Sequence, residues 1–364
     1  MRLCIPPLGA ALLLSGCASL PAERSADCAA ATGPPITYSA DGTTAITHID
    51  VLTYNIEGLP WPARQNRAPY LREIGKRLAA FRAQHNGPDI IVFQEVFSGA
   101  AAQAVEDTGY TDLTVGPHTS TRQAPNVQGP LPGRRNIFRG EIAQNFTSSG
   151  LVIATDYPVV LAQARPYARG SCAGFDCLSN KGALMAEIII PGVPGRIDVF
   201  NTHMQAQRAS GVSVERHAAA HERQTNELSD FASTTGDLSS PTIIAGDFNM
   251  RNSDVRFEHF SRQFPLQNVH QFCIEKPDQC EVLEHWEHAD QWRRVQDKQY
   301  FSSGAVVKIR PIRAEGMFDG GPSGPVLSDH NGFRVVYELS WPVNGSQTAS
   351  VSACAAPTSA SLNK

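Results

Sequence analysis

Apolar runs of strand length recur along the middle of the chain. Their sequences are IDVLTYN from residue 49, DIIVFQE from 89, SGLVIAT from 149, ALMAEIII from 183, RIDVFNTH from 196, PTIIAGDFN from 241 and NGFRVVYEL from 331. Several are apolar almost without interruption, which is typical of strands covered on both faces. The pattern therefore predicts sheets buried inside the protein.

Two stretches between these runs show apolar residues at helical spacing. In residues 69–84 the apolar face consists of Leu71, Ile74, Leu78 and Phe81. Residues 213–231 predict a second, more polar helix with Leu228 and Phe231 facing inward. Residues 116–136 show no periodicity and predict a long loop, which is often a functional segment. Strands and helices mix without repeats or an internal Pro-rich linker, which predicts one α/β domain over residues 46–341.

The two ends of the chain differ from this domain. Residues 1–16 combine one arginine, a short apolar stretch and small residues, which indicates a secretion signal rather than a membrane span of about 20 apolar residues. The letters LLSGC resemble the lipobox of bacterial lipoproteins, which implies acylation of Cys17 and, with Ala18 following, an anchor in the outer membrane. Plain secretion, or release to the periplasm, is the alternative. Residues 17–45 and 342–364 are rich in small and polar residues and predict a tether and a flexible tail.

Composition and cysteine content narrow the class of protein. The chain has 364 residues, of which 41% are hydrophobic, as in ordinary globular proteins. Its formal net charge of -4 lacks the basic excess typical of proteins that bind nucleic acid backbones. Apart from the signal and Cys17, the cysteines are even in number, which suggests disulfides in an exported chain. The pairing stays open, although closeness in sequence favours Cys172–Cys177 and Cys273–Cys280, with Cys28–Cys354 at the two ends.

Polar side chains of a few kinds stand where the predicted strands end or begin. They are Asn55, Glu95, His203, Asp247, Asn249, Asp329 and His330. Alternate residues of an extended chain point the same way, so Asp247 and Asn249 would face one side while Phe248 packs on the other. A turn is the ordinary explanation for such residues at one strand end. Carboxylates, carboxamides and imidazoles without cysteine, however, are ligands for a hard cation such as Mg²⁺ and partners for a phosphate.

Taken in order, the motifs N, QE, TH, GDFN and SDH resemble the endonuclease, exonuclease and phosphatase superfamily. Pancreatic deoxyribonuclease and the neutral sphingomyelinases belong to this superfamily, and the match runs from Asn55 to His330. The resemblance implies a four-layer α/β sandwich, in which two mostly antiparallel sheets pack face to face with helices outside. The site would lie at one edge of the sandwich.

The resemblance also implies a metal site. Glu95 would be the principal ligand of Mg²⁺ and Asn55 a second ligand, for one or two ions, with Mn²⁺ as an alternative metal. One motif departs from the family pattern, which usually places a DxxF element before the last motif. The stretch VQDKQYF supplies only a loose equivalent, in Asp297.

Roles in catalysis follow from the same resemblance. His330 would be the general base that takes a proton from water, with Asp329 beside it. His203 would bind a phosphate oxygen and help the leaving group depart. Asp247 and Asn249 would orient the attacking water and the phosphate. Together these groups cover the needs of phosphodiester hydrolysis at neutral pH.

One stretch points to the substrate. FDCLSNKGALMAEI resembles a segment that sphingomyelinases carry, matched here by Asp176, Leu178, Asn180, Lys181 and Gly182. NTHMQAQ and ERQTNEL resemble two more of their segments, and deoxyribonucleases lack this set. An ammonium at Lys181 would offset the charge that develops on the phosphate. An Asp176–Lys181 pair that opens at a membrane would couple interface binding to chemistry.

The sequence therefore predicts a Mg²⁺-dependent phosphodiesterase, most similar to the enzymes that hydrolyse sphingomyelin to ceramide and phosphocholine. The expected partner is a phospholipid or sphingolipid membrane, not nucleic acid, and nothing indicates a protein partner, so we expect a monomer. Trp286 and Trp292 belong either to the core or to an interface. Two other functions remain open, a secreted or surface nuclease and a non-catalytic lipoprotein binding module. The first needs a basic groove, and the second has no need of Glu95 and two histidines together.

Overall fold

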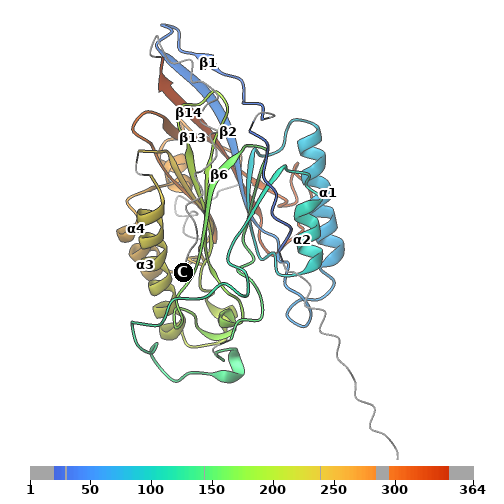
Figure 1. Ribbon diagram of the computed structural model, residues 1–364, viewed down its shortest axis with the longest axis vertical. Helices are drawn as coiled ribbons and strands as arrows, with labels where there is room; N and C mark the ends of the chain where they lie inside the picture. The colour runs from blue at the N-terminus through green and yellow to red at the C-terminus, as the bar shows by residue number, and fades with distance from the viewer. Residues whose placement is uncertain (1–19, 29–30, 143, 238, 284–294, 344–364) are drawn as a thin grey trace, which may run out of the picture.

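Two β-sheets lie face to face between two layers of helices (Figure 1). The computed structural model describes residues 20–28, 31–142, 144–237, 239–283 and 295–343. Helices α1 (Ala68–Ala83) and α2 (Gly99–Glu106) lie outside one sheet, and α3 (Val214–Thr235) and α4 (Asp254–Gln263) lie outside the other. A short helix, α5 (Val269–Glu275), packs against the core between the sheets. The predicted four-layer sandwich is confirmed.

Most neighbouring strands run antiparallel, as predicted. The larger sheet has the order β11–β13–β14–β2–β3–β5–β4, with β1 paired to β2. Its strands are β1 (Thr37–Tyr38), β2 (Thr44–Asn55), β3 (Ile90–Gln94), β4 (Asp112–Val115), β5 (Val152–Thr155), β11 (Glu281–Val282), β13 (Lys308–Met317) and β14 (Gly332–Pro342). The smaller sheet, in the order β10–β12–β9–β8–β7–β6, contains β6 (Val159–Pro166), β7 (Gly182–Ile188), β8 (Ile197–His203), β9 (Thr242–Asp247), β10 (Gln267–Asn268) and β12 (Asp297–Ser302). Within the described residues the parallel pairs are β2–β3, β8–β9 and β11–β13.

Apolar cores fill the spaces between all four layers. The central one joins the sheets through buried residues such as Val51 and Val92 from one and Leu184, Val199 and Ile243 from the other. A second core lies between the larger sheet and α1 and α2, and a third lies between the smaller sheet and α3 and α4. Because each sheet is covered on both faces, its central strands are continuous apolar runs, and this is why those runs were visible in the sequence.

Both predicted helices bury the predicted faces. Leu71, Ile74 and Leu78 of α1 are buried, and so are Leu228 and Phe231 of α3. Between β4 and the 3₁₀ turn η1 (Ile137–Arg139) the described chain forms no regular strand or helix, in agreement with the predicted long loop. Two further 3₁₀ turns, η2 (Gly174–Leu178) and η3 (Arg208–Ser210), flank the smaller sheet.

The parallel pairs bring the polar strand ends to one edge of the molecule. Since β2 and β3 run side by side in the same direction, Asn55 and the residue after Gln94 emerge together. The pair β8–β9 does the same for His203 and Asp247, which lie opposite each other. Strand β12 runs antiparallel to β9 and begins with Asp297 opposite Asp247. Strand β14 runs antiparallel to β2, so the SDH motif before it enters at this edge too.

The described part of the predicted tether, residues 17–45, lies against the domain. The side chain of Leu20 is buried in the core beneath α1 and α2. Arg24 pairs with Leu113 through two backbone hydrogen bonds of 3.1 and 2.9 Å. Strand β1 adds to the end of β2. This segment extends the sheet because backbone pairing needs no apolar pattern, and so composition alone suggested a free tether.

Two predicted disulfides are present, Cys172–Cys177 and Cys273–Cys280. No helix of the described residues has the length and apolar character that crossing a membrane requires. Several predictions concern positions outside the described residues: the signal segment 1–16, Cys17, Trp286, Trp292, Cys354 and nearly all of the tail.

Candidate active site

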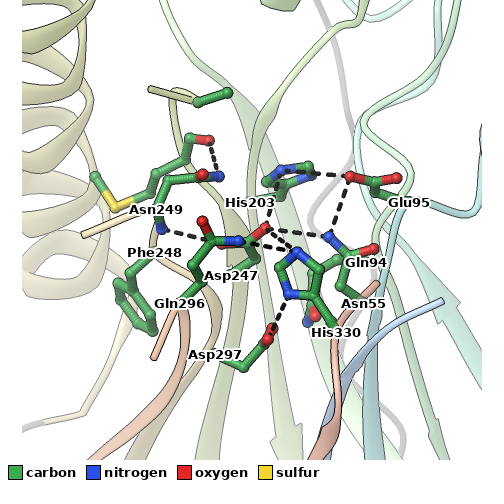
Figure 2. A network of polar contacts seen from close by, with 12 residues as sticks. Asn55, Gln94, Glu95, His203, Asp247, Phe248, Asn249, Gln296, Asp297 and His330 are labelled. Atoms are coloured by element: carbon green, nitrogen blue, oxygen red, sulfur yellow. Dashed lines mark hydrogen bonds and ion pairs between the residues drawn. The ribbon is translucent and has the colours of Figure 1, made fainter. Parts of the chain in front are cut away.

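Three side chains at the shared edge form a candidate metal centre (Figure 2). Glu95, His203 and Asp247 each offer one ligand atom, and these atoms lie within 4.8 Å of one another. His203 Nε2 is 3.4 Å from Asp247 Oδ2 and 4.0 Å from Glu95 Oε1. Asn55 Nδ2 donates to both carboxylates at 3.1 Å. The edge therefore gathers four of the predicted site residues from four different strands.

The backbone is specialised where it delivers these groups. Glu95 has a φ of 60° and Asn249 a φ of 52°, in the left-handed region that residues with side chains adopt at a cost of about 1–3 kcal/mol. Gly246 has a φ of 145°, and a Cβ at this position would lie 2.0 Å from the carbonyl oxygen of Thr202. Only glycine lets β9 approach β8 this closely, one residue before Asp247. The glycine of the GDFN motif is therefore required by the close packing of β9 against β8.

The electrostatics of the cluster fit a hard cation. Burial raises the pKa of Glu95 to about 7, and the nearby charge of Asp247 adds to the effect. Burial likewise raises the pKa of Asp247 to about 6. The buried carboxylate of Asp247 and the half-buried carboxylate of Glu95, together with an amide and an imidazole, form a donor set suited to Mg²⁺ or Mn²⁺. The Asn55 amide oxygen accepts a hydrogen bond from the Glu57 N–H at 3.1 Å, so its predicted role as a ligand requires the amide to turn.

His330 is held by Asp297 and not by its sequence neighbour. Asp297 Oδ2 lies 2.5 Å from His330 Nδ1; Asp297 is buried, and the His330 side chain is 9% exposed. Asp329, which was expected beside the imidazole, turns away to pair with Arg64 at 3.2 Å and is half exposed. The backbone bends at residues 328–330, before β14 begins, and the two side chains contact different groups.

The second ring nitrogen of His330, Nε2, faces the metal cluster. His330 Nε2 lies 3.8 Å from Asp247 Oδ2 and 2.9 Å from Gln296 Nε2. Burial alone would lower the pKa of His330, but the charges of Asp297 and Asp247 outweigh burial and raise it well above its usual value. A bound cation would weaken this effect by offsetting Asp247.

His203 has the opposite character. Burial holds its pKa well below the usual value, and the charges of Lys181 and His330 add to this shift. The imidazole is therefore neutral, with Nε2 directed at the carboxylates. Its Nδ1 is buried and has no hydrogen-bond partner in the described part of the chain. A neutral imidazole is able either to donate one hydrogen bond to a phosphate oxygen or to bind a metal.

Lys181 and Asp176 form the pair expected of them. Lys181 Nζ lies 3.1 Å from Asp176 Oδ1 and donates to the carbonyl oxygen of Met204 at 3.0 Å. Asn249 Nδ2 donates to the same carbonyl at 3.1 Å. Met204 follows His203, so these contacts place the ammonium and the carboxamide beside the metal cluster. The Asn249 side chain thus contacts Met204, and its backbone N–H donates to Asp247 Oδ1 at 3.0 Å.

Sequence reasoning missed the residues that hold this edge in place. Ser328 accepts a hydrogen bond from His330 N–H at 3.2 Å and donates to the Asn55 carbonyl at 2.7 Å, and its place in the SDH motif was the available signal. Gln94 Nε2 donates to Asn201 Oδ1 at 2.8 Å, which joins the two sheets directly behind the site. Arg256 of α4 is 3% exposed and donates to the carbonyl groups of Gln205, Ala206 and Asn249, close to the Asp176–Lys181 pair. No local sequence pattern predicted this role.

Fold and site together define a hydrolase with a candidate cation site at the edge of a two-sheet sandwich. A model of the Endonuclease/Exonuclease/phosphatase family matches residues 52–330, and the chain belongs to this family. The resemblance drawn from the motifs is thereby confirmed, because the matched segment contains the full set from Asn55 to His330.

Sphingomyelinases are among the similar proteins. A sphingomyelinase of Mycobacterium tuberculosis is 26% identical over 207 residues, which are 56% of this chain and 34% of that protein. The chain thus matches about a third of the length of this curated relative. Sphingomyelinase C from Streptomyces griseocarneus covers 79% of this chain and 99% of its own, with 18% identity and a TM-score of 0.55. A beta toxin variant from Staphylococcus aureus with bound magnesium ions has the same coverage, 15% identity and a TM-score of 0.56. At these identities the solved structures show a shared fold.

Proposed function

We propose that the protein is a Mg²⁺-dependent phosphodiesterase that hydrolyses sphingomyelin to ceramide and phosphocholine. The observation that carries the reaction class is the meeting of Glu95, His203 and Asp247 with the His330–Asp297 pair at one buried edge. The substrate class is supported by the pair of buried Lys181 and half-buried Asp176 beside that edge, and by the similarity to sphingomyelinases. A nuclease remains the rival outcome of the test below.

A bound divalent cation would offset the charges of Glu95 and Asp247, polarise a phosphate oxygen and stabilise the leaving oxygen. The residues of the chain supply the rest. Asp297 holds His330 Nδ1, so Nε2 faces Asp247. Once a cation offsets the charge of Asp247, neutral His330 would take a proton through Nε2 from a water placed beside that carboxylate. The water oxygen bonds to phosphorus while the bond from phosphorus to the ceramide oxygen breaks. That oxygen then takes up a proton from solvent, and His330 returns its proton to solvent, so the protons balance.

His203 and Lys181 act on the phosphate. Neutral His203 is suited to donate from Nε2 to a phosphate oxygen in place of its contact with Asp247. Lys181 is 4% exposed, and its ammonium already contacts the carbonyl of Met204, the residue after His203. Movement from Asp176 to the phosphate would give it a charge-assisted hydrogen bond that strengthens as negative charge develops.

The decisive experiment is a parallel assay on sphingomyelin vesicles, phosphatidylcholine vesicles and plasmid DNA, with Mg²⁺, with Mn²⁺ and with a chelator. We expect release of phosphocholine from sphingomyelin, loss of release on chelation and recovery with Mg²⁺. Rapid nicking of plasmid without phosphocholine release would replace the lipid substrate with DNA. Hydrolysis that survives the chelator would reject the metal.

For the cellular setting we propose a monomer that is exported and anchored by lipid on Cys17 in a bacterial outer membrane, with a lipid membrane as its partner. The LLSGC motif supports the anchor. Acyl chains contribute about 0.8 kcal/mol per buried methylene, so more than one chain would hold the protein firmly. Cys17→Ser should release active protein from the membrane or leave an uncleaved precursor. Native protein that is already soluble and begins after residue 20 would contradict the anchor.

A further inference from the structure

The long loop between β4 and β5 exposes large apolar side chains to solvent. Phe138 is 90% exposed, Phe146 59% and Ile137 56%. Phe175, in the turn η2, is 42% exposed. Single exposed apolar residues are ordinary, but several large ones on adjoining segments usually mark a binding surface.

These side chains belong to two segments that are joined. The guanidinium of Arg139 lies 5.5 Å from the centre of the Phe175 ring. Phe146 N–H donates to the carbonyl of Leu178 at 2.7 Å, at the end of η2. We call Ile137, Phe138, Phe146 and Phe175 the exposed apolar surface.

Buried polar contacts fix the conformation of the loop that carries this surface. Glu141, 4% exposed, binds Arg216 at 2.7 Å and accepts a hydrogen bond from Gly174 N–H at 2.9 Å. Arg216 in turn donates to the carbonyl groups of Leu131 and Pro132. The loop therefore presents its apolar side chains from a fixed frame.

The charge of the loop identifies the kind of partner. Residues 116–142 contain Arg122, Arg134, Arg135 and Arg139 but a single acid, the buried and paired Glu141. The chain as a whole is negative, at -4, so this basic stretch is a local feature. Aromatic residues interleaved with arginines suit the boundary of an anionic bilayer, where rings enter the acyl region and guanidinium groups meet the headgroups.

The exposed apolar surface is tied to the active-site edge. Its segment η2 carries Asp176 and leads to Lys181, which are paired at 3.1 Å. Asn180 Nδ2 donates to the carbonyl groups of His118 and Thr121 at 2.7 and 2.9 Å, which fastens the start of the loop to the same segment. In Figure 1 the loop lies at the lower end of the molecule, opposite β1.

We propose that the exposed apolar surface and the arginines around it dock the protein on an anionic lipid bilayer. The proposal rests on the proposed function for its purpose, because an enzyme for a bilayer lipid must hold its active-site edge against the membrane. It places that contact on residues 137–142 and 144–146 and on η2. Docking can be measured without turnover, so the docking proposal and the proposed function can be tested separately.

The first test measures binding to phosphatidylcholine vesicles with and without phosphatidylglycerol. It uses the full chain in a Cys17→Ser background, so that no acyl chain contributes. Phe138→Ser combined with Phe146→Ser should weaken vesicle binding by roughly 10- to 100-fold, because two rings no longer leave water. The matched control is Tyr38→Ser, which removes an aromatic side chain that is 63% exposed on β1, and it should bind as the parent does.

A second pair of variants tests the charge. Arg122→Ser and Arg134→Ser should each weaken binding to the anionic vesicles by about fivefold and leave binding to neutral vesicles unchanged. Arg72→Ser, an exposed arginine of α1, is the control and should have little effect.

Three outcomes would overturn docking on this surface. In the first, the double Phe variant binds vesicles as the parent does. In the second, its activity on a water-soluble phosphodiester falls as much as its vesicle binding does. In the third, the substitutions change the oligomeric state in solution, which would make the surface a contact between copies. The failure of the proposed function looks different. Vesicle binding that depends on Phe138 and Phe146 without release of phosphocholine would leave docking intact and reject the substrate.

Discussion

The two acidic neighbours of His330 allow a direct test of the site. Asp297 contacts the imidazole at 2.5 Å, whereas Asp329 precedes it in sequence but pairs with Arg64. Asp297→Asn keeps the shape and an acceptor for Nδ1–H but removes the charge that stabilises the imidazolium. Asp329→Asn makes the same chemical change at the exposed neighbour. Comparing the two separates contact from sequence adjacency.

The expected magnitudes differ widely. A positioned general base contributes roughly 10²- to 10⁴-fold in rate, so Asp297→Asn should lower kcat by about 10²-fold or more. An exposed ion pair contributes at most about 1 kcal/mol to stability, and Asp329 touches no group proposed to act on substrate, so its variant should stay within about threefold of wild type. Asp297 Oδ1 is buried without a hydrogen-bond partner in the described residues, and an amide NH₂ there would cost about 1–3 kcal/mol of stability.

The assay is steady-state release of phosphocholine at saturating Mg²⁺, with urea unfolding of each variant as the control for folding. We expect kcat and kcat/KM to fall together for Asp297→Asn, because the lost interaction matters in the transition state. A large loss for Asp329→Asn with normal turnover for Asp297→Asn would refute the assignment. Equal turnover of both variants and wild type would remove the proposed role of Asp297 as the partner of His330.

Three further changes test other parts of the molecule. Glu95→Gln removes a charge from the candidate metal centre and should raise the Mg²⁺ concentration needed for activity; full activity at sub-millimolar Mg²⁺, on the order of the weak affinity of an open site, would contradict its role as a ligand. Lys181→Ala should lower turnover on sphingomyelin vesicles with little change in Mg²⁺ dependence, whereas Lys76→Ala on the outer helix should match wild type; unimpaired Lys181→Ala would end its role. Burial raises the pKa of Asp89 to about 6, above about 3.9 in the unfolded chain, so the folded state prefers its proton and this residue lowers stability as pH rises from about 4 to 6. Asp89→Asn should remove that loss, on the order of 2 kcal/mol, in denaturant titrations at low and neutral pH; an unchanged difference between the two pH values would contradict it.

Strands buried on both faces were predictable because their pattern is local. Strand β3 is buried at all five positions and is apolar except for its last residue, whereas β8 is buried at all seven positions but also carries polar residues such as Asp198 and Asn201. Strand β6 is half exposed at the margin of its sheet, and β13 mixes buried and half-buried positions around Pro311. These strands are stabilised by backbone pairing with adjacent strands, so no periodicity in the sequence predicted them.

The candidate site was predictable where one motif carries both place and chemistry. Asn55, Glu95, His203 and Asp247 end buried runs, and the parallel pairing of their strands brings them together. The contacts that support the site across the two sheets have no comparable motif in the sequence. The link from Gln94 to Asn201 spans 107 residues, and the contacts of Arg256 reach other segments through backbone carbonyl groups that any sequence offers.

Asp297 shows how register, rather than sequence distance, decides which acid serves a histidine. It begins β12 directly opposite Asp247, because β12 and β9 are antiparallel. That register places the Asp297 carboxylate under the imidazole that enters from before β14, 33 positions along the chain. Asp329 is adjacent to the imidazole in sequence, but its half-exposed side chain pairs with Arg64 instead. A pairing between strands of one sheet thus fixes the orientation of a side chain supplied by the other, so the packing of the two sheets is itself a condition for the proposed chemistry.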